Sequence, residues 1–139
     1  MTSFKTALTT ATAALLLTGC GLTEPNPSLP LGAEPMAAAT TFDAWYAKTE
    51  ACSGLSGSLQ SVQWYVVKGV DTFETDQGQK VGMWERSGSG SVIVVAGNYR
   101  NHEMVIRHEM LHSLIGESGH PAEYFVERCS LTWSTWSGD

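Results

Sequence analysis

The stretch SVIVVAGNYRNHEMVIRHEMLHSLIG, residues 91–116, decides the expected fold. Residues 91–96 form a continuous run dominated by Val and Ile, which is typical of a strand buried on both faces. Gly97-Asn98 interrupts the run, because Gly and Asn favour turns. A helix is then predicted over about 101–115, and Gly116 ends it, as glycine commonly does at helix C-termini. A strand followed by a helix is therefore the centre of the predicted domain.

The rest of the chain predicts another helix and further strands around this centre. The segment TFDAWYA, residues 41–47, begins a capped helix, and Gly54 and Gly57 end it. The run VQWYVV, residues 62–67, is β-branched and aromatic and predicts a strand. The remaining expectations are a polar, turn-rich segment at 71–80, a short strand at 81–85, a turn at 87–90 and a short helix within 121–126. The order of helix, strands and helix indicates an α+β fold, with a short β-sheet packed on the helix at 101–115.

The N-terminal segment has the pattern of an export signal. Lys5 precedes an apolar run, Ala7–Leu17, that is too short to span a bilayer comfortably. The run ends in LTGC, residues 17–20, which resembles the lipobox of bacterial lipoproteins, where cleavage precedes the cysteine and the cysteine is lipidated. An ordinary signal peptide with an incidental cysteine is the alternative.

The lipobox interpretation divides the chain into three parts. The segment after the cysteine is rich in Pro, Ser, Gly and Ala, which is typical of an unfolded linker. The protein is then exported and bound to the membrane of the bacterial cell envelope through its lipid. We therefore expect a lipoprotein signal peptide at 1–19, a lipidated Cys20 with a proline-rich tether over 20–39, and a folded domain at 40–139.

Charge and cysteine content narrow the possible partners. The chain has 139 residues and a formal net charge of −6, and its lysines and arginines are not clustered, which argues against a nucleic-acid partner. With Cys20 assigned to lipid, Cys52 and Cys129 remain in an oxidising compartment, where a disulfide between them is favoured. Two unrelated buried thiols are the alternative.

The segment HEMLH, residues 108–112, is the strongest chemical signal in the sequence. His108 and His112 are about 40° apart around a helix, so both imidazoles can reach one ion. Zn²⁺ is commonly bound by neutral imidazole nitrogens. Glu109 lies about 100° from His108, so it flanks the ligand face without being a ligand. Because the histidines share an apolar face, they need polar partners, and a shared metal would supply one. Two histidines satisfied within the core are the alternative. The apolar residues of that face are Met104, Val105, Leu111 and Ile115.

A third ligand is expected from the chain after the helix. His120 is the best candidate, because the glycines at 116 and 119 allow the chain to turn back towards the helix end. Glu117 is the second candidate, and an exposed loop histidine is the alternative assignment for His120. His102 lies about 120° from His108 around the axis, so we interpret it as a surface residue at the helix start. Tyr124 is a candidate donor to a developing oxyanion, or else a core tyrosine.

The HEMLH segment resembles the active-site helix of the zincin metallopeptidases. The resemblance covers only this helix and the following turn, and it implies that His108 and His112 are zinc ligands and that Glu109 is a general base. The chain departs from the metzincin pattern HExxHxxGxxH, since Ser118 stands where that pattern has its third histidine. The arrangement of HEMLH, GHP and Cys129 also resembles small bacterial lipoproteins that carry an HExxH site.

These features together predict a zincin-like domain that acts as a zinc metallopeptidase. Its Zn²⁺ cofactor and Glu109 would hydrolyse a peptide or protein substrate at the cell envelope. A catalytically inactive, zinc-stabilised binding module is the alternative function. If the strand at 91–96 is an edge strand, substrate could add beside it as a further strand. Its apolar sequence is equally compatible with a buried strand.

Overall fold

The computed structural model describes residues 28–138. The expected signal peptide at 1–19 and the expected lipidation site at Cys20 lie outside these residues. No helix between residues 28 and 138 is both long and apolar enough to cross a membrane.

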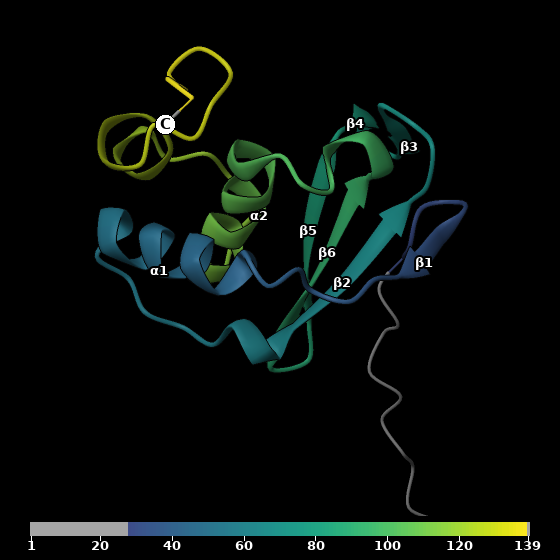
Figure 1. Ribbon diagram of the computed structural model, residues 1–139, viewed down its shortest axis with the longest axis horizontal. Helices are drawn as coiled ribbons and strands as arrows, with labels where there is room; N and C mark the ends of the chain where they lie inside the picture. Colours follow the sequence, from purple (N-terminus) through teal and green to yellow (C-terminus); the bar gives the residue numbers. More distant parts are fainter. Residues whose placement is uncertain (1–27, 139) are drawn as a thin grey trace, which may run out of the picture.

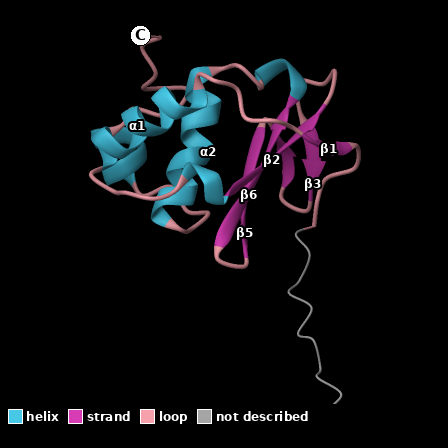
Figure 2. Ribbon diagram, turned by 60° about the horizontal axis from the view of Figure 1, so that its bottom comes forward, coloured by secondary structure: helices cyan, strands magenta, loops and turns pink. Residues whose placement is uncertain are grey.

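The domain has two layers, a four-stranded sheet and a layer of helices on one of its faces (Figures 1 and 2). The expected α+β class is confirmed, and a separate two-stranded hairpin stands beside the sheet. The strands are β1 (Ala33–Pro35), β2 (Val62–Val67), β3 (Phe73–Thr75), β4 (Gly78–Lys80), β5 (Gly82–Ser87) and β6 (Gly90–Ala96). The helices are α1 (Phe42–Ser53) and α2 (Glu103–Ile115), with short helical segments at Leu59–Ser61, Gly97–Tyr99 and Glu123–Arg128.

The strand β6 lies in the middle of the sheet, which decides whether residues 91–96 form an edge strand or a buried strand. The sheet order is β1-β2-β6-β5, with β6 parallel to β2 and antiparallel to β5. The residues from Val92 to Ala96 are completely buried. The strand is therefore buried as its apolar run indicates, and substrate cannot add beside it. The edge strand on this side of the sheet is β5.

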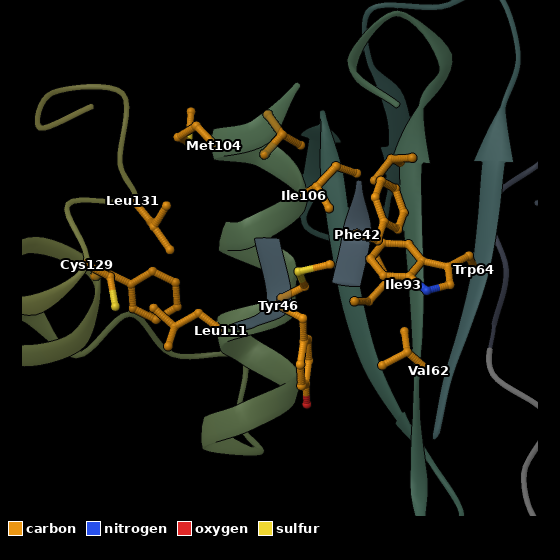
Figure 3. Close-up of a cluster of buried hydrophobic side chains, with 14 of the residues drawn as sticks. Phe42, Tyr46, Val62, Trp64, Ile93, Met104, Ile106, Leu111, Cys129 and Leu131 are labelled. Carbon is orange, nitrogen blue, oxygen red and sulfur yellow. The ribbon is translucent and has the colours of Figure 1, made fainter. Parts of the chain in front are cut away.

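The helix α2 is buried on two sides. Figure 3 shows Ile106 directed towards the sheet, where Ile93 and Trp64 lie, and Leu111 on the opposite side of the helix near Leu131. The helix α1 and the C-terminal segment, residues 121–138, both pack against α2 on sides away from the sheet. The helix that carries HEMLH is therefore held between the sheet and the C-terminal segment.

Two parts of the fold differ from the sequence prediction. The sheet begins inside the expected tether, because β1 pairs with β2 in antiparallel register, so the expected domain boundary at residue 40 is too late. Proline 35 is tolerated there because β1 is an edge strand, where a missing N–H group breaks no ladder bond. The polar segment 71–80 was expected to be turns but forms the β3–β4 hairpin. Only Phe73 of this hairpin is buried, so the segment lacks the apolar alternation that predicts strands.

The expected disulfide between Cys52 and Cys129 is present. It joins the last turn of α1 to the residue that follows the helical segment Glu123–Arg128. That segment is π-helical and starts two residues later than the helix predicted from Pro121. The bond therefore fixes the C-terminal segment to the helical layer, and Arg107 in the first half of α2 donates to Cys52 Sγ.

Candidate metal centre

Three histidine side chains converge at one point beside α2. His108 and His112 come from successive turns of the helix, and His120 comes from the loop that follows it. One nitrogen from each ring lies within 4.8 Å of the others, and the Nε2 atoms of His108 and His120 are 3.0 Å apart. Two nitrogens on a tetrahedral zinc ion, each at about 2.05 Å, would be about 3.3 Å apart. His120, the predicted third ligand, thus completes a cluster in which the distances between ring nitrogens suit a metal ion.

Hydrogen bonds on the outer side of two rings orient their lone pairs. The Nδ1 atom of His108 lies 2.7 Å from the carbonyl oxygen of Leu131, and the Nδ1 atom of His112 lies 2.9 Å from that of Glu117. A carbonyl oxygen only accepts, so Nδ1 carries the proton in both rings. Each Nε2 therefore presents a lone pair to the cluster, which is the arrangement typical of metal-binding histidines.

The second candidate ligand, Glu117, and the residue that was not expected to be a ligand, His102, both lie outside the cluster. Glu117 contributes its backbone carbonyl to His112, while its side chain is exposed and lies outside the three-histidine group. His102 is also outside the group, as expected. Its ring is only partly exposed, however, because it packs against the rings of Tyr99 and Trp133, at centroid distances of 5.8 and 5.5 Å. Its assignment as a plain surface residue is therefore wrong.

An apolar base supports the histidines, and the sequence did not reveal it. The ring of Phe125 is fully buried and lies 4.7, 4.7 and 4.9 Å from the rings of His108, His112 and His120. The indole of Trp84 stacks near His112, with centroids 6.3 Å apart, and its Nε1–H donates to Ser91 Oγ at 2.8 Å. The sequence does not indicate either residue, because their distance from the histidines depends on tertiary structure.

The surroundings lower the pKa of all three histidines, which favours their neutral form. Burial lowers the pKa of His108, and the nearby His120 lowers it further, against the opposing effect of the hydrogen bond to Leu131. Burial, with the adjacent imidazoles, lowers the pKa of His112 to about 4. The pKa of His120 is also lowered, by burial and by the charge of Lys80. Neutral imidazoles are the form that binds metal ions.

Glu109 is buried beside the cluster and has no polar partner. Glu109 is 5% exposed, and its carboxyl borders the cavity without a hydrogen bond to any group among residues 28–138. Burial raises the pKa of Glu109 to about 8, although the charge of Lys80 opposes this. A buried acid without a partner is costly unless a cation lies nearby.

Gly82 of β5 makes the space that Glu109 occupies. A Cβ atom at this position would lie 2.5 Å from Glu109 Oε1 and 3.0 Å from its Cγ and Cδ. Any other residue at position 82 would therefore displace the carboxyl. This glycine was not recognised from the sequence, because the contact joins residues 27 positions apart.

The histidines and Glu109 border a cavity of about 380 Å³. Its walls come from α2, from the edge strand β5, from the β3–β4 hairpin and from the C-terminal segment. Trp133, which is 61% exposed, stands at the C-terminal wall. Tyr124 is not among the lining residues. Its ring packs against the hydrophobic core and lies 5.6 Å from the guanidinium carbon of Arg128. The structure therefore does not bring Tyr124 to this cavity.

The donor set at this site fits a metal ion. His108 and His112 present Nε2 lone pairs to the cluster, a ring nitrogen of His120 lies within 4.8 Å of theirs, and the acid Glu109 borders the same cavity. The geometry thus shows three histidines close enough together to bind one metal ion. Comparison of the chain with protein-family models, with curated proteins and with solved structures finds no significant match.

Proposed function

We propose that this chain is a zinc-dependent hydrolase of peptide bonds. The observation that carries the proposal is the arrangement of the histidines: carbonyl groups fix Nδ1 of His108 and His112, and one nitrogen from each of the three rings lies within 4.8 Å of the others beside a cavity. Three imidazoles suit zinc, and three protein ligands leave the fourth position for water or substrate, as in catalytic zinc sites.

Glu109 is the proposed general base. A bound Zn²⁺ would supply a Lewis acid for the substrate carbonyl and a positive charge close to Glu109. A nearby positive charge lowers the pKa of a carboxyl group, so Glu109 becomes a proton acceptor at neutral pH instead of the protonated acid that burial alone favours. A Glu109 carboxylate oxygen then takes a proton from the attacking water and returns it to the leaving amine nitrogen.

The edge strand β5 is the proposed binding site for the substrate backbone. It is hydrogen-bonded to β6 on one side only, and Gly82, Met83 and Trp84 line the cavity beside Glu109. An extended peptide can add to such an edge through main-chain hydrogen bonds. This position would bring a scissile bond close to Glu109. The alternative of a zinc-stabilised binding module is less favoured, because a structural zinc site is normally closed by four protein ligands.

The proposed place of action is the bacterial cell envelope, with the chain anchored through lipid on Cys20. Its support is the LTGC segment, residues 17–20. Cys20→Ser should move the protein from the membrane fraction to the soluble fraction. Unchanged membrane association of this variant would refute lipid anchoring at Cys20.

Zinc content and peptide cleavage test the proposed function together. The purified protein should hold one zinc ion per chain and cleave members of a peptide library, and a chelator should stop the cleavage until zinc is restored. His108→Ala and His112→Ala should abolish zinc binding, and His120→Ala should weaken it far more than Glu117→Ala or His102→Ala. Full zinc occupancy in His112→Ala would show that the three-histidine site is not where zinc binds. If Glu117→Ala loses zinc and His120→Ala retains it, the third ligand is Glu117 and not His120.

A further inference from the structure

Most basic side chains in the described part of the chain already have a partner. Lys48 and Arg107 pair with Glu103, Lys68 pairs with Glu34, and Arg128 pairs with Glu123. Arg86 donates to the carbonyl oxygen of Gly116 at 2.7 Å. Between residues 28 and 138, Lys80 and Arg100 are the basic residues whose side chains form neither an ion pair nor a hydrogen bond. Of these two, only Lys80 lines the cavity beside the histidines.

A rigid element holds Lys80 at the cavity. It is the last residue of β4 and lies opposite Phe73 in the antiparallel pair with β3. The buried ring of Phe73 packs with Val92 and Val94 on the face of the sheet opposite the helices, which anchors the hairpin. The next residue but one is Gly82, the neighbour of Glu109. The position of Lys80 next to the reacting groups is therefore set by the fold.

Lys80 lines the same cavity as Glu109 and His120. Nevertheless, Lys80 forms no ion pair with Glu109. Lys80 is only partly exposed, and a partly buried ammonium group without a partner loses hydration that a bound anion would replace.

We propose that Lys80 binds a carboxylate of the substrate next to the scissile bond, so that the preferred substrates are peptides with an acidic group at that position. The proposal rests on the proposed peptide hydrolysis. The carboxylate belongs either to an Asp or Glu side chain or to the C-terminus of the peptide. The net charge of −6 disfavours the approach of acidic substrates, so a positive side chain at the cavity would favour their binding. Lys80 is the only lysine or arginine among residues 28–138 that lines the cavity, and it thus acts as a specificity-determining residue.

Matched peptides test this specificity and distinguish the two sources of the carboxylate. One pair differs by Glu or Gln beside the cleaved bond, and the other pair has a free or an amidated C-terminus. Wild-type protein should favour the acidic member of one pair by on the order of 10-fold or more in kcat/KM. Lys80→Met should remove this preference while keeping zinc bound, and Lys80→Arg should restore it. Lys68→Met is the matched control, because Lys68 pairs with Glu34 away from the cavity, and it should keep the wild-type preference.

A binding measurement provides a readout that does not depend on hydrolysis. Glutarate is titrated into the metal-free protein and followed by NMR chemical shifts. Lys80→Met should weaken its binding at least about fivefold, and Lys68→Met should leave it unchanged. If wild type cleaves peptides but Lys80→Met keeps both its peptide preference and its glutarate affinity, the role of Lys80 is overturned while the hydrolase stands. If no peptide is cleaved but glutarate binding depends on Lys80, the peptide hydrolase fails and the carboxylate site stands.

Discussion

The space between Gly82 and Glu109 can hold the carboxyl group of Glu109 or a Cβ atom at position 82, but not both. Gly82→Ala would put a methyl group 2.5 Å from the present position of Glu109 Oε1. The flexible carboxyl, and not the strand backbone, is the part that can move. Since the zinc ligands do not touch Gly82 in this way, Gly82→Ala should keep zinc and lower kcat/KM by about 10-fold or more, because small displacements of catalytic groups are costly.

A double-mutant cycle isolates this effect. In a Glu109→Ala background the carboxyl is absent, so Gly82→Ala should change residual activity and stability little. Measurement of kcat/KM, zinc content and the free energy of unfolding in the four proteins decides the matter. An equal effect of Gly82→Ala in both backgrounds would mean that the methyl group acts through the strand and not through Glu109.

The sequence predicts some residues of the site and not others, for physical reasons. His108 and His112 are predictable because a four-residue spacing on a helix brings two side chains together through local geometry. His120 follows from flexible glycines after the helix end. Phe125 and Gly82 were not recognised, because their role depends on packing between distant parts of the chain. Tyr124 was predicted as an oxyanion donor, but the ring that lies against the histidines is that of its neighbour Phe125.

The elements around the site differ in how clearly the sequence encodes them. β6 and α2 were predicted within two residues at each end, because a buried apolar run and a long helix-forming segment that ends at a glycine are strong signals. β1 and the β3–β4 hairpin were missed. Both are short, and their strands are held by pairing with neighbours and by a single buried ring, Phe73, and not by a pattern of their own.

The disulfide acts on the site through the C-terminal segment. Cys52 and Cys129 are separated by 77 residues, and two residues after Cys129 the carbonyl of Leu131 accepts the hydrogen bond from His108. Replacing both cysteines by serine should lower the free energy of unfolding by roughly 4 kcal/mol, from the loop entropy released in the unfolded chain. Zinc affinity should also fall, because Leu131 is held less firmly.

Urea unfolding and zinc competition with a chelator measure the two effects separately. Reduction of the wild-type protein should reproduce the unfolding result without any substitution. If the variant unfolds at the same urea concentration as wild type, with the same slope, the bond does not stabilise the fold. If stability falls but zinc affinity does not, the link from Cys129 through Leu131 to His108 is rejected.

The whole molecule joins four structural parts around one cavity. The helix α2 provides two histidines and Glu109, the edge strand β5 provides space for Glu109, the hairpin provides Lys80, and the C-terminal segment covers the outer side of α2. A domain of this size has few side chains to spare for the interior, yet it places a largely buried acid beside three histidines at the cavity. Such a cost is expected at a functional site and not in a plain structural core.

The central claim is that Glu109 takes the proton of the attacking water, and Glu109→Gln tests it most directly. The substitution keeps the shape of the side chain and leaves the three histidines in place, so the variant should fold and hold one zinc ion per chain. An amide cannot accept a proton at neutral pH, so cleavage of a peptide that wild type cleaves in a chelator-sensitive manner should fall by on the order of 10² to 10⁴-fold. Chelator-sensitive cleavage at the wild-type rate by the zinc-loaded Glu109→Gln protein would contradict the account.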